Sequence, residues 1–224
     1  WVSMATSPLI RLIAVRSSLN QGVEVAGADR LIVINRVSLM QPLPISYRDR
    51  ILRVPGVTAA TFATWFGGVY QDERNFFPQI VIDPGAWRQM YPEFLISDAD
   101  WGEFMKDRQA CLVGADTAKR FGWKIGGRIP IKGTYIPGVW EFNLRGIYRG
   151  ARPSDDTTQF WFRRDYFEEG APAYWKGIVG WYIVKVANPD AAPRVVAAID
   201  DSFSNSPWET KTETEKAFAA GFVK

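Results

Sequence analysis

The chain has 224 residues, with 27 Lys and Arg against 24 Asp and Glu, 47% hydrophobic residues, one Cys and no His. The absence of His excludes Ser-His-Asp and Cys-His nucleophile pairs and the HExxH zinc site, and a single Cys excludes an internal disulfide. The hydrophobic fraction is typical of a folded chain with a substantial core. Acidic residues are interleaved with the basic ones, so nucleic acid is not an expected partner.

The region near the N-terminus contains one strand-helix-strand unit. After Asp29 comes the β-branched run LIVINRV, which is typical of a buried strand, followed by the Pro-rich break QPLPIS. Ser46 is expected to cap a short helix with Tyr47, Ile51 and Val54 on its apolar face. Residues 57–66 are rich in Val, Thr and aromatic residues, which indicates a second strand.

A second unit of the same kind lies near the C-terminus. Residues 178–186 (IVGWYIVKV) read as a buried strand, and Asn188-Pro189 is a helix start. Apolar residues then follow helical spacing from Ala192 to Phe203. Residues 208–211 are expected to form a short closing strand. Two such units pack as a split βαβ layer.

The middle of the chain, residues 84–175, has a different pattern. Short helices are expected over 84–91, 98–106 (capped by Asp98) and 115–121, the last ended by Gly122. Strands are expected over 111–114, 128–132, 139–149 and 159–162; residues 139–149 alternate apolar and polar side chains. The predicted class is therefore α+β. It has a porter-like βαβ subdomain from 25–83 and 176–224, a β-rich subdomain of 84–175 inserted into it, and residues 1–24 as a lead-in helix or an expression remnant.

The order of three segments resembles a known family. These are Leu52 to Ala60 (LRVPGVTAA), Leu112 to Gly133 (LVGADTAKRFGWKIGGRIPIKG), and a strand ending in Arg145-Gly146-Ile147. They are similar to the periplasmic core domain of MacB/FtsX-type ABC transporter permeases, over about residues 25–224. Family members often carry Asp where Gly127 stands, which is a departure that affects one turn.

The resemblance implies a non-catalytic periplasmic domain of an inner-membrane protein, placed between the first and second membrane helices of a permease. It implies a cytoplasmic ATPase partner, a dimer in the membrane, and a role in export, efflux, lipoprotein release or activation of a periplasmic partner. No cofactor and no metal are expected, because the chain has no GxxxxGK[ST] nucleotide motif and no DxDxDG calcium loop.

Candidate contacts with a partner or substrate are aromatic. Trp65, Phe66 and Tyr70 flank the Gly67-Gly68 pair, and Tyr135 and Trp140 flank a second turn. Large rings beside flexible Gly residues suit recognition surfaces. The alternative is that these rings belong to the core, and for the first group this alternative is favoured.

Two other functional classes stay open: a secreted carbohydrate-binding or glycosidase domain, and a structural domain of the cell envelope. Glycosidases need two opposed carboxylates. The local pairs Asp98/Asp100, Asp155/Asp156 and Glu168/Glu169 read instead as helix caps and solvated loops, and Arg163-Arg164 as a solvated face. Cys111 reads as a small buried hydrophobe.

The C-terminal segment suggests a helix that continues beyond the domain. Thr212 and Glu215 fit a capping box with a helix from about 213, and the sequence AFAAGFV then loses its polar face. Phe218 and Phe222 are expected to be exposed. Residues 25–30 and 215–224 are expected on the same side of the fold, with residues 84–175 distal to the membrane.

Overall fold

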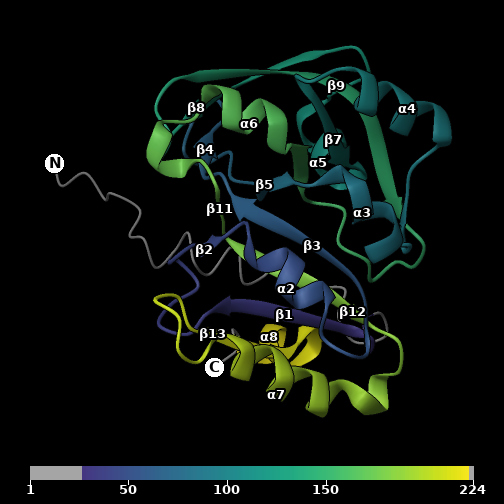
Figure 1. Ribbon diagram of the computed structural model, residues 1–224. Helices are drawn as coiled ribbons and strands as arrows, with labels where there is room; N and C mark the ends of the chain where they lie inside the picture. The colour runs from purple at the N-terminus through teal and green to yellow at the C-terminus, as the bar shows by residue number, and fades with distance from the viewer. Residues whose placement is uncertain (1–26, 222–224) are drawn as a thin grey trace, which may run out of the picture.

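The computed structural model describes residues 27–221 and contains one mixed sheet of eleven strands (Figure 1). From one edge to the other these are β13 (Thr210–Thr214), β1 (Arg30–Asn35), β12 (Trp181–Val186), β3 (Val57–Trp65), β5 (Gln79–Ile82), β10 (Phe160–Arg163), β7 (Ala110–Gly114), β9 (Val139–Gly150), β8 (Arg128–Gly133) and β4 (Gly68–Val69); β6 (Phe94–Leu95) pairs with β9. A separate pair joins β2 (Leu43–Pro44) to β11 (Ile178–Val179).

The helices are α2 (Tyr47–Leu52), α3 (Pro84–Met90), α4 (Asp98–Lys106), α5 (Ala115–Phe121), α6 (Arg164–Gly170), α7 (Ala192–Phe203) and α8 (Glu215–Gly221), with 3-10 turns η1 (Ala173–Trp175) and η2 (Pro189–Ala191). In the described part of the chain, none of them has the length and apolar character required to cross a bilayer.

The two chain ends build two interlocking split βαβ units. β12 pairs antiparallel with both β1 and β3, so β1 and β3 run parallel on either side of it, joined through α2. β1 likewise lies between the parallel strands β12 and β13, which are joined through α7. This is the ferredoxin-like arrangement, and it confirms the α+β class with a split βαβ layer.

This layer is buried on both faces because its strands alternate two sets of apolar side chains. Leu31 and Val33 of β1 face α2 and α7, whereas Ile32 and Ile34 face α3 and α8. Figure 1 shows α2 and α7 in front of this layer, α8 behind it and the middle region above it. A run of apolar residues without polar alternation, as in β1, is therefore the expected signature.

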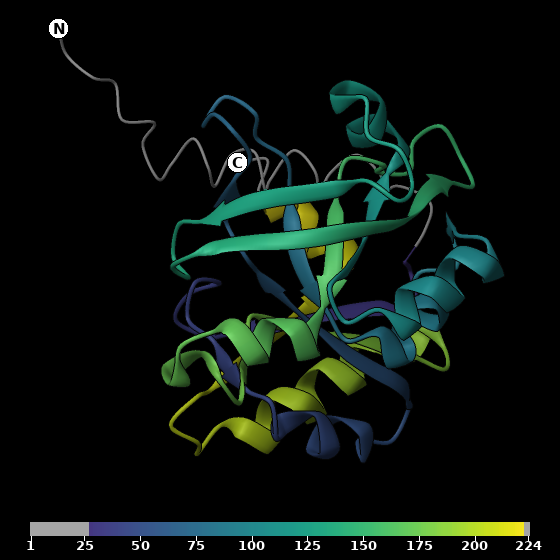
Figure 2. The ribbon, with the colours of Figure 1, turned by 90° about the horizontal axis from the view of Figure 1, so that it is seen from above.

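The middle strands curl so that β4 returns to β5 around an aromatic core. Figure 2 shows β8 and β9 as long neighbouring strands across this region. The buried Gln79 side chain bridges β5 and β4. Its Oε1 accepts from Gly68 N at 2.5 Å, and its Nε2 donates to Gly68 O at 3.1 Å. Gly68 has to lack a side chain because a Cβ there would collide with Ile131. One amide thus replaces two ladder hydrogen bonds.

We expect Gln79→Leu to lower the free energy of unfolding by about 2 kcal/mol, because both Gly68 backbone groups lose their partner. Urea denaturation measures this change. The exposed Gln89→Leu is the matched control and is expected to change stability by less than about 0.5 kcal/mol. Equal effects of the two substitutions on stability would contradict the bridging role of Gln79 between β5 and β4.

Most of the expected helices and strands are present, but several of the predicted capping residues are wrong. α4 spans the expected residues, but Ser97 caps it by accepting from Asp100 N, and Asp98 is its first residue. Ser46 makes no side-chain cap bond to α2, since its own backbone is already helical. β5, β6 and α6 were not expected. The boundaries at 84 and 175 stay a prediction, because one sheet runs through both regions.

The C-terminal segment differs from the expectation. Thr212 belongs to β13, where its backbone N–H and hydroxyl donate to Asp200, and Thr214 caps α8 by accepting from Ala217 N. Phe218 is buried, 6% exposed, within the core between β1 and α3, so the expected exposure is wrong. The lead-in residues 1–24 and Phe222 lie outside the described residues.

Candidate functional site

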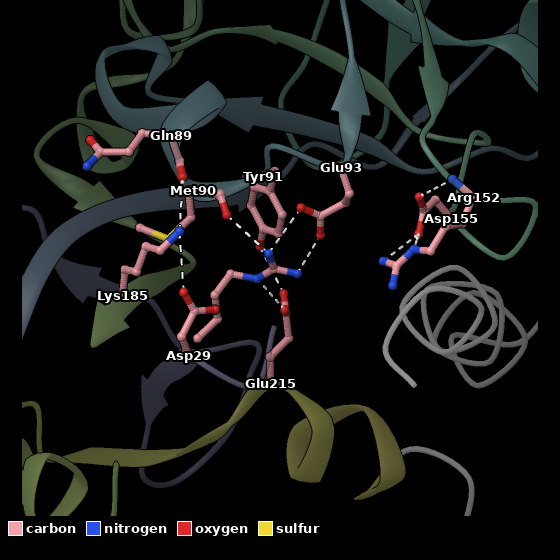
Figure 3. A network of polar contacts seen from close by, with 10 residues as sticks. Asp29, Gln89, Met90, Tyr91, Glu93, Arg152, Asp155, Lys185 and Glu215 are labelled. Atoms are coloured by element: carbon pink, nitrogen blue, oxygen red, sulfur yellow. Dashed lines mark hydrogen bonds and ion pairs between the residues drawn. The ribbon is translucent and has the colours of Figure 1, made fainter. Parts of the chain in front are cut away.

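A buried ion-pair network surrounds Arg30 at the start of β1 (Figure 3). Arg30 Nε donates to Glu215 Oε2 and Nη2 to Glu93 Oε1, each at 2.6 Å, and Nη1 donates to Met90 O at 3.1 Å. Tyr91 Oη donates to the second oxygen of Glu215 at 3.1 Å, and its ring lies under the guanidinium. The side chains of Arg30, Glu93 and Glu215 are 6–11% exposed. We call Arg30, Tyr91, Glu93 and Glu215 the Arg30 network.

The local fold explains why these residues meet. β1 pairs with β13 in the register Leu31 to Thr214, so Arg30 lies beside Glu215, the first residue of α8. Gly27 sits against both side chains with a φ of 91°, where a Cβ would collide with Glu215. Residues 27–30 and the start of α8 at Glu215 therefore lie on the same side of the fold, in accord with the expected neighbouring position of the two ends.

Burial shapes the electrostatics of the network. Burial raises the pKa of Glu215, and the neighbouring Arg30 charge only partly offsets this. Burial alone lowers the pKa of Arg30, but the carboxylates of Glu215 and Glu93 outweigh it, so the pKa of Arg30 is raised and its charge is kept. One guanidinium thus forms ion pairs with two carboxylates.

A cavity of about 70 Å³ adjoins the network. Its lining joins both parts of the chain: Arg30, Glu215 and Phe218 come from the ends, whereas Trp87, Glu93, Phe94, Asp155, Asp156 and Gln159 come from the middle. Within residues 27–221, no group of three or more acidic or Cys side chains is arranged to hold a metal ion. The chemistry available here is ion pairing and hydrogen bonding at a junction of segments.

Asp155 and Asp156 are buried, which corrects their expected place in a solvated loop. Asp155 accepts from the backbone and guanidinium of Arg152, and Asp156 accepts from Thr158 and from Gln159 Nε2. Burial raises the pKa of Asp156, although these hydrogen bonds oppose the shift. Both carboxylates organise the loop that precedes β10.

We expect Asp156 to make the unfolding free energy fall as the pH rises. Its pKa is higher in the folded state, so this stabilisation is complete below the ordinary pKa of 3.8 and is lost as the pH rises through the folded value. Asp156→Asn is expected to remove this slope, because the titrating group is lost. It also lowers stability, because the Asn NH2 group faces the Gln159 Nε2 donor. Chemical denaturation from about pH 4 to 7 measures it, with the exposed Asp98→Asn as control. An unchanged slope in Asp156→Asn would contradict the assignment.

The five aromatic candidates fall into two groups. Phe66 and Trp140 are 0% and 4% exposed and pack edge to face, with their ring centroids 5.4 Å apart. Both are therefore core residues rather than surface contacts. Tyr135 is 45% exposed, and Trp65 and Tyr70 are partly exposed. Gly67 has a φ of 66° and contacts Trp65 and Tyr135. A contact role for Trp65, Tyr70 and Tyr135 stays a prediction.

The remaining charged candidates have structural partners. Glu168 pairs with Arg164 and Glu169 with Arg108, while Asp98 and Asp100 lie in the first turn of α4. Arg164 is 7% exposed and packs over Phe62 and Phe167, so its expected place on a solvated face was wrong. Cys111 is fully buried, and burial raises the pKa of its thiol, in accord with a small hydrophobe.

Comparison with solved structures shows the fold. The periplasmic region of MacB from Actinobacillus actinomycetemcomitans matches 88% of this chain and 94% of its own length, with a TM-score of 0.58 and 10% identity. The extracellular domain of the noncanonical ABC-type transporter YknZ from Gram-positive bacteria matches 83% and 98%, with a TM-score of 0.59 and 8% identity. The chain has the fold of these transporter domains.

A third structure, a domain of a protein described as a permease from Porphyromonas gingivalis, matches 83% of this chain and 88% of its own, with a TM-score of 0.50 and 13% identity. No family model matches the sequence. No curated protein matches it either. The fold implied by the MacB/FtsX resemblance is thus confirmed by structure.

The Arg30 network was missed by sequence reasoning. Its two carboxylates, Glu93 and Glu215, are 63 and 185 residues from Arg30 along the chain, so no local pattern connects them. A signal was present in Arg30 itself, a charge that directly precedes a continuous apolar strand and that needs a partner once the strand is buried.

Proposed function

We propose that this chain is a periplasmic, non-catalytic domain of an inner-membrane ABC transporter permease. The observation that carries the proposal is the shared fold, which extends over 88–98% of the length of three solved domains. Those structures are themselves extracytoplasmic parts of transporters or permeases.

The position of the chain ends supports the proposal. Gly27 lies against Glu215, so the start of β1 and the start of α8 meet on one side of the domain. Two membrane helices that flank one inserted domain require this geometry. The middle region then lies distal to the membrane.

The domain would couple ATP hydrolysis by a cytoplasmic ATPase partner to export, lipoprotein release or activation of a periplasmic partner, within a dimeric transporter. The partly exposed side chains Trp65, Tyr70 and Tyr135 are the proposed contacts for a partner or substrate. Their rings offer large contact areas that lose little side-chain freedom on binding.

Purification of the protein with its natural flanking sequence tests this function. We expect it in the membrane fraction together with an ATPase subunit or domain, and we expect the purified assembly to hydrolyse ATP while the isolated 224-residue chain does not. Recovery in the soluble fraction, without ATPase activity, would contradict the proposal.

A further inference from the structure

We infer that movement of α8 is transmitted to the middle of the fold through the Arg30 network, with Arg30 at its centre. This inference rests on the proposed function, in which α8 is the segment that leads toward the membrane. Its basis is the geometry of the Arg30 network, which links three segments that are distant in the sequence (Figure 3).

The first link joins Arg30 to α8. Glu215 begins this helix, and its two carboxylate oxygens accept from Arg30 Nε and from Tyr91 Oη. One turn later, Phe218 and Ala219 are buried against the sheet. A displacement of α8 therefore moves a charged group that is bound inside the protein.

The second link joins Arg30 to the middle region. Both oxygens of Glu93 accept from the guanidinium, at 2.6 and 3.2 Å. The backbone O of Glu93 accepts from Ala151 N at 2.8 Å, and the next residue, Phe94, pairs with Gly150 at the end of β9. Glu93 consequently moves with β6 and β9.

Burial turns these two links into one mechanical connection. A buried charge that loses its partner carries a large desolvation penalty, so Arg30 follows Glu215 or loses one of its two carboxylates. The adjoining cavity of about 70 Å³ provides space for such a side-chain movement without a clash in the close-packed core. Buried ion pairs often contribute little net stability compared with apolar packing, so stability alone does not explain three buried charges at this junction.

Hydrogen exchange of the isolated chain tests the connection. Glu93→Gln removes a charge that lies outside α8 and makes no direct bond to it. We expect backbone amides of α8 to exchange about tenfold faster in this variant, while amides of the buried strand β7 change less than threefold. The matched control is Glu103→Gln, an exposed carboxylate that pairs with Lys106 on α4, and it leaves α8 unchanged. If Glu93→Gln does not fold, Glu93→Asp, which keeps the charge but shortens its reach, is measured in the same way.

Unchanged exchange in α8, or an increase equal to that of β7, would overturn the inference, since the effect would then be absent or global. The result is independent of membrane location and ATPase activity. If α8 exchanges faster in Glu93→Gln but the protein is not part of a transporter, the proposed function is rejected and the link between Glu93 and α8 is retained. If exchange in α8 is unchanged but the protein is part of a transporter, only the link is rejected.

Discussion

Phe66→Ala is expected to lower the free energy of unfolding by about 3–5 kcal/mol, because a fully buried ring is lost from a close-packed core. Phe66 is 0% exposed and lies edge to face against Trp140, Phe142 and Phe162, with centroid distances of 5.1–6.4 Å. Urea denaturation of the isolated chain measures the change.

Tyr135→Ala provides the matched comparison, since Tyr135 lies beside Gly67, the residue that follows Phe66, and is 45% exposed. Its expected effect on stability is within about 0.5 kcal/mol. Similar stability changes in the two variants would show that the division of the aromatic candidates into core and surface residues is wrong.

Trp161→Ala is the second substitution with a large expected effect, again about 3–5 kcal/mol. Trp161 is fully buried and stacks on Tyr148 with parallel rings whose centroids are 4.0 Å apart, while Trp87 and Phe94 pack against it at centroid distances of 5.4 and 5.2 Å. Its indole N–H also donates to Gln159 Oε1 at 2.8 Å, so the substitution leaves a buried acceptor without its donor.

Trp161→Phe separates these two contributions. It retains an aromatic ring against Tyr148 but removes the N–H, and we expect it to restore more than half of the stability lost in Trp161→Ala. Thermal or urea unfolding, followed by near-ultraviolet circular dichroism, measures both variants. Equal losses of stability in Trp161→Phe and Trp161→Ala would assign the effect to the hydrogen bond instead of to the ring packing.

The elements that the sequence predicts well are those with long, regular patterns. α7 repeats its apolar residues at helical spacing, and β9 alternates buried Trp140, Phe142 and Leu144 with more exposed neighbours. The two split βαβ units followed from the continuous apolar runs of β1 and β12 and from the helical spacing of α7. The resemblance to transporter domains independently implied the same fold.

Short elements and tertiary contacts were not predictable in this way. β5 has only four residues, all buried, and β6 has two, so neither shows a period. The end of α8 reads as a helix without a polar face, but Phe218 is covered by residues that are distant in the sequence. Arg30, Glu93 and Glu215 are brought together by the register of β1 with β13 and by the position of β6, which only the assembled sheet determines.

The orientation of the domain in the cell is the most direct test of the account. Cys111 is fully buried and burial raises the pKa of its thiol, so the native chain has little background reactivity with maleimides. Val139 is 68% exposed at the start of β9, and Val139→Cys places one reactive thiol on the middle region. In spheroplasts that express the protein with its natural flanking sequence, a membrane-impermeant maleimide is predicted to label Val139→Cys before lysis as fully as after it. Labelling that appears only after lysis would place the domain in the cytoplasm and contradict the account.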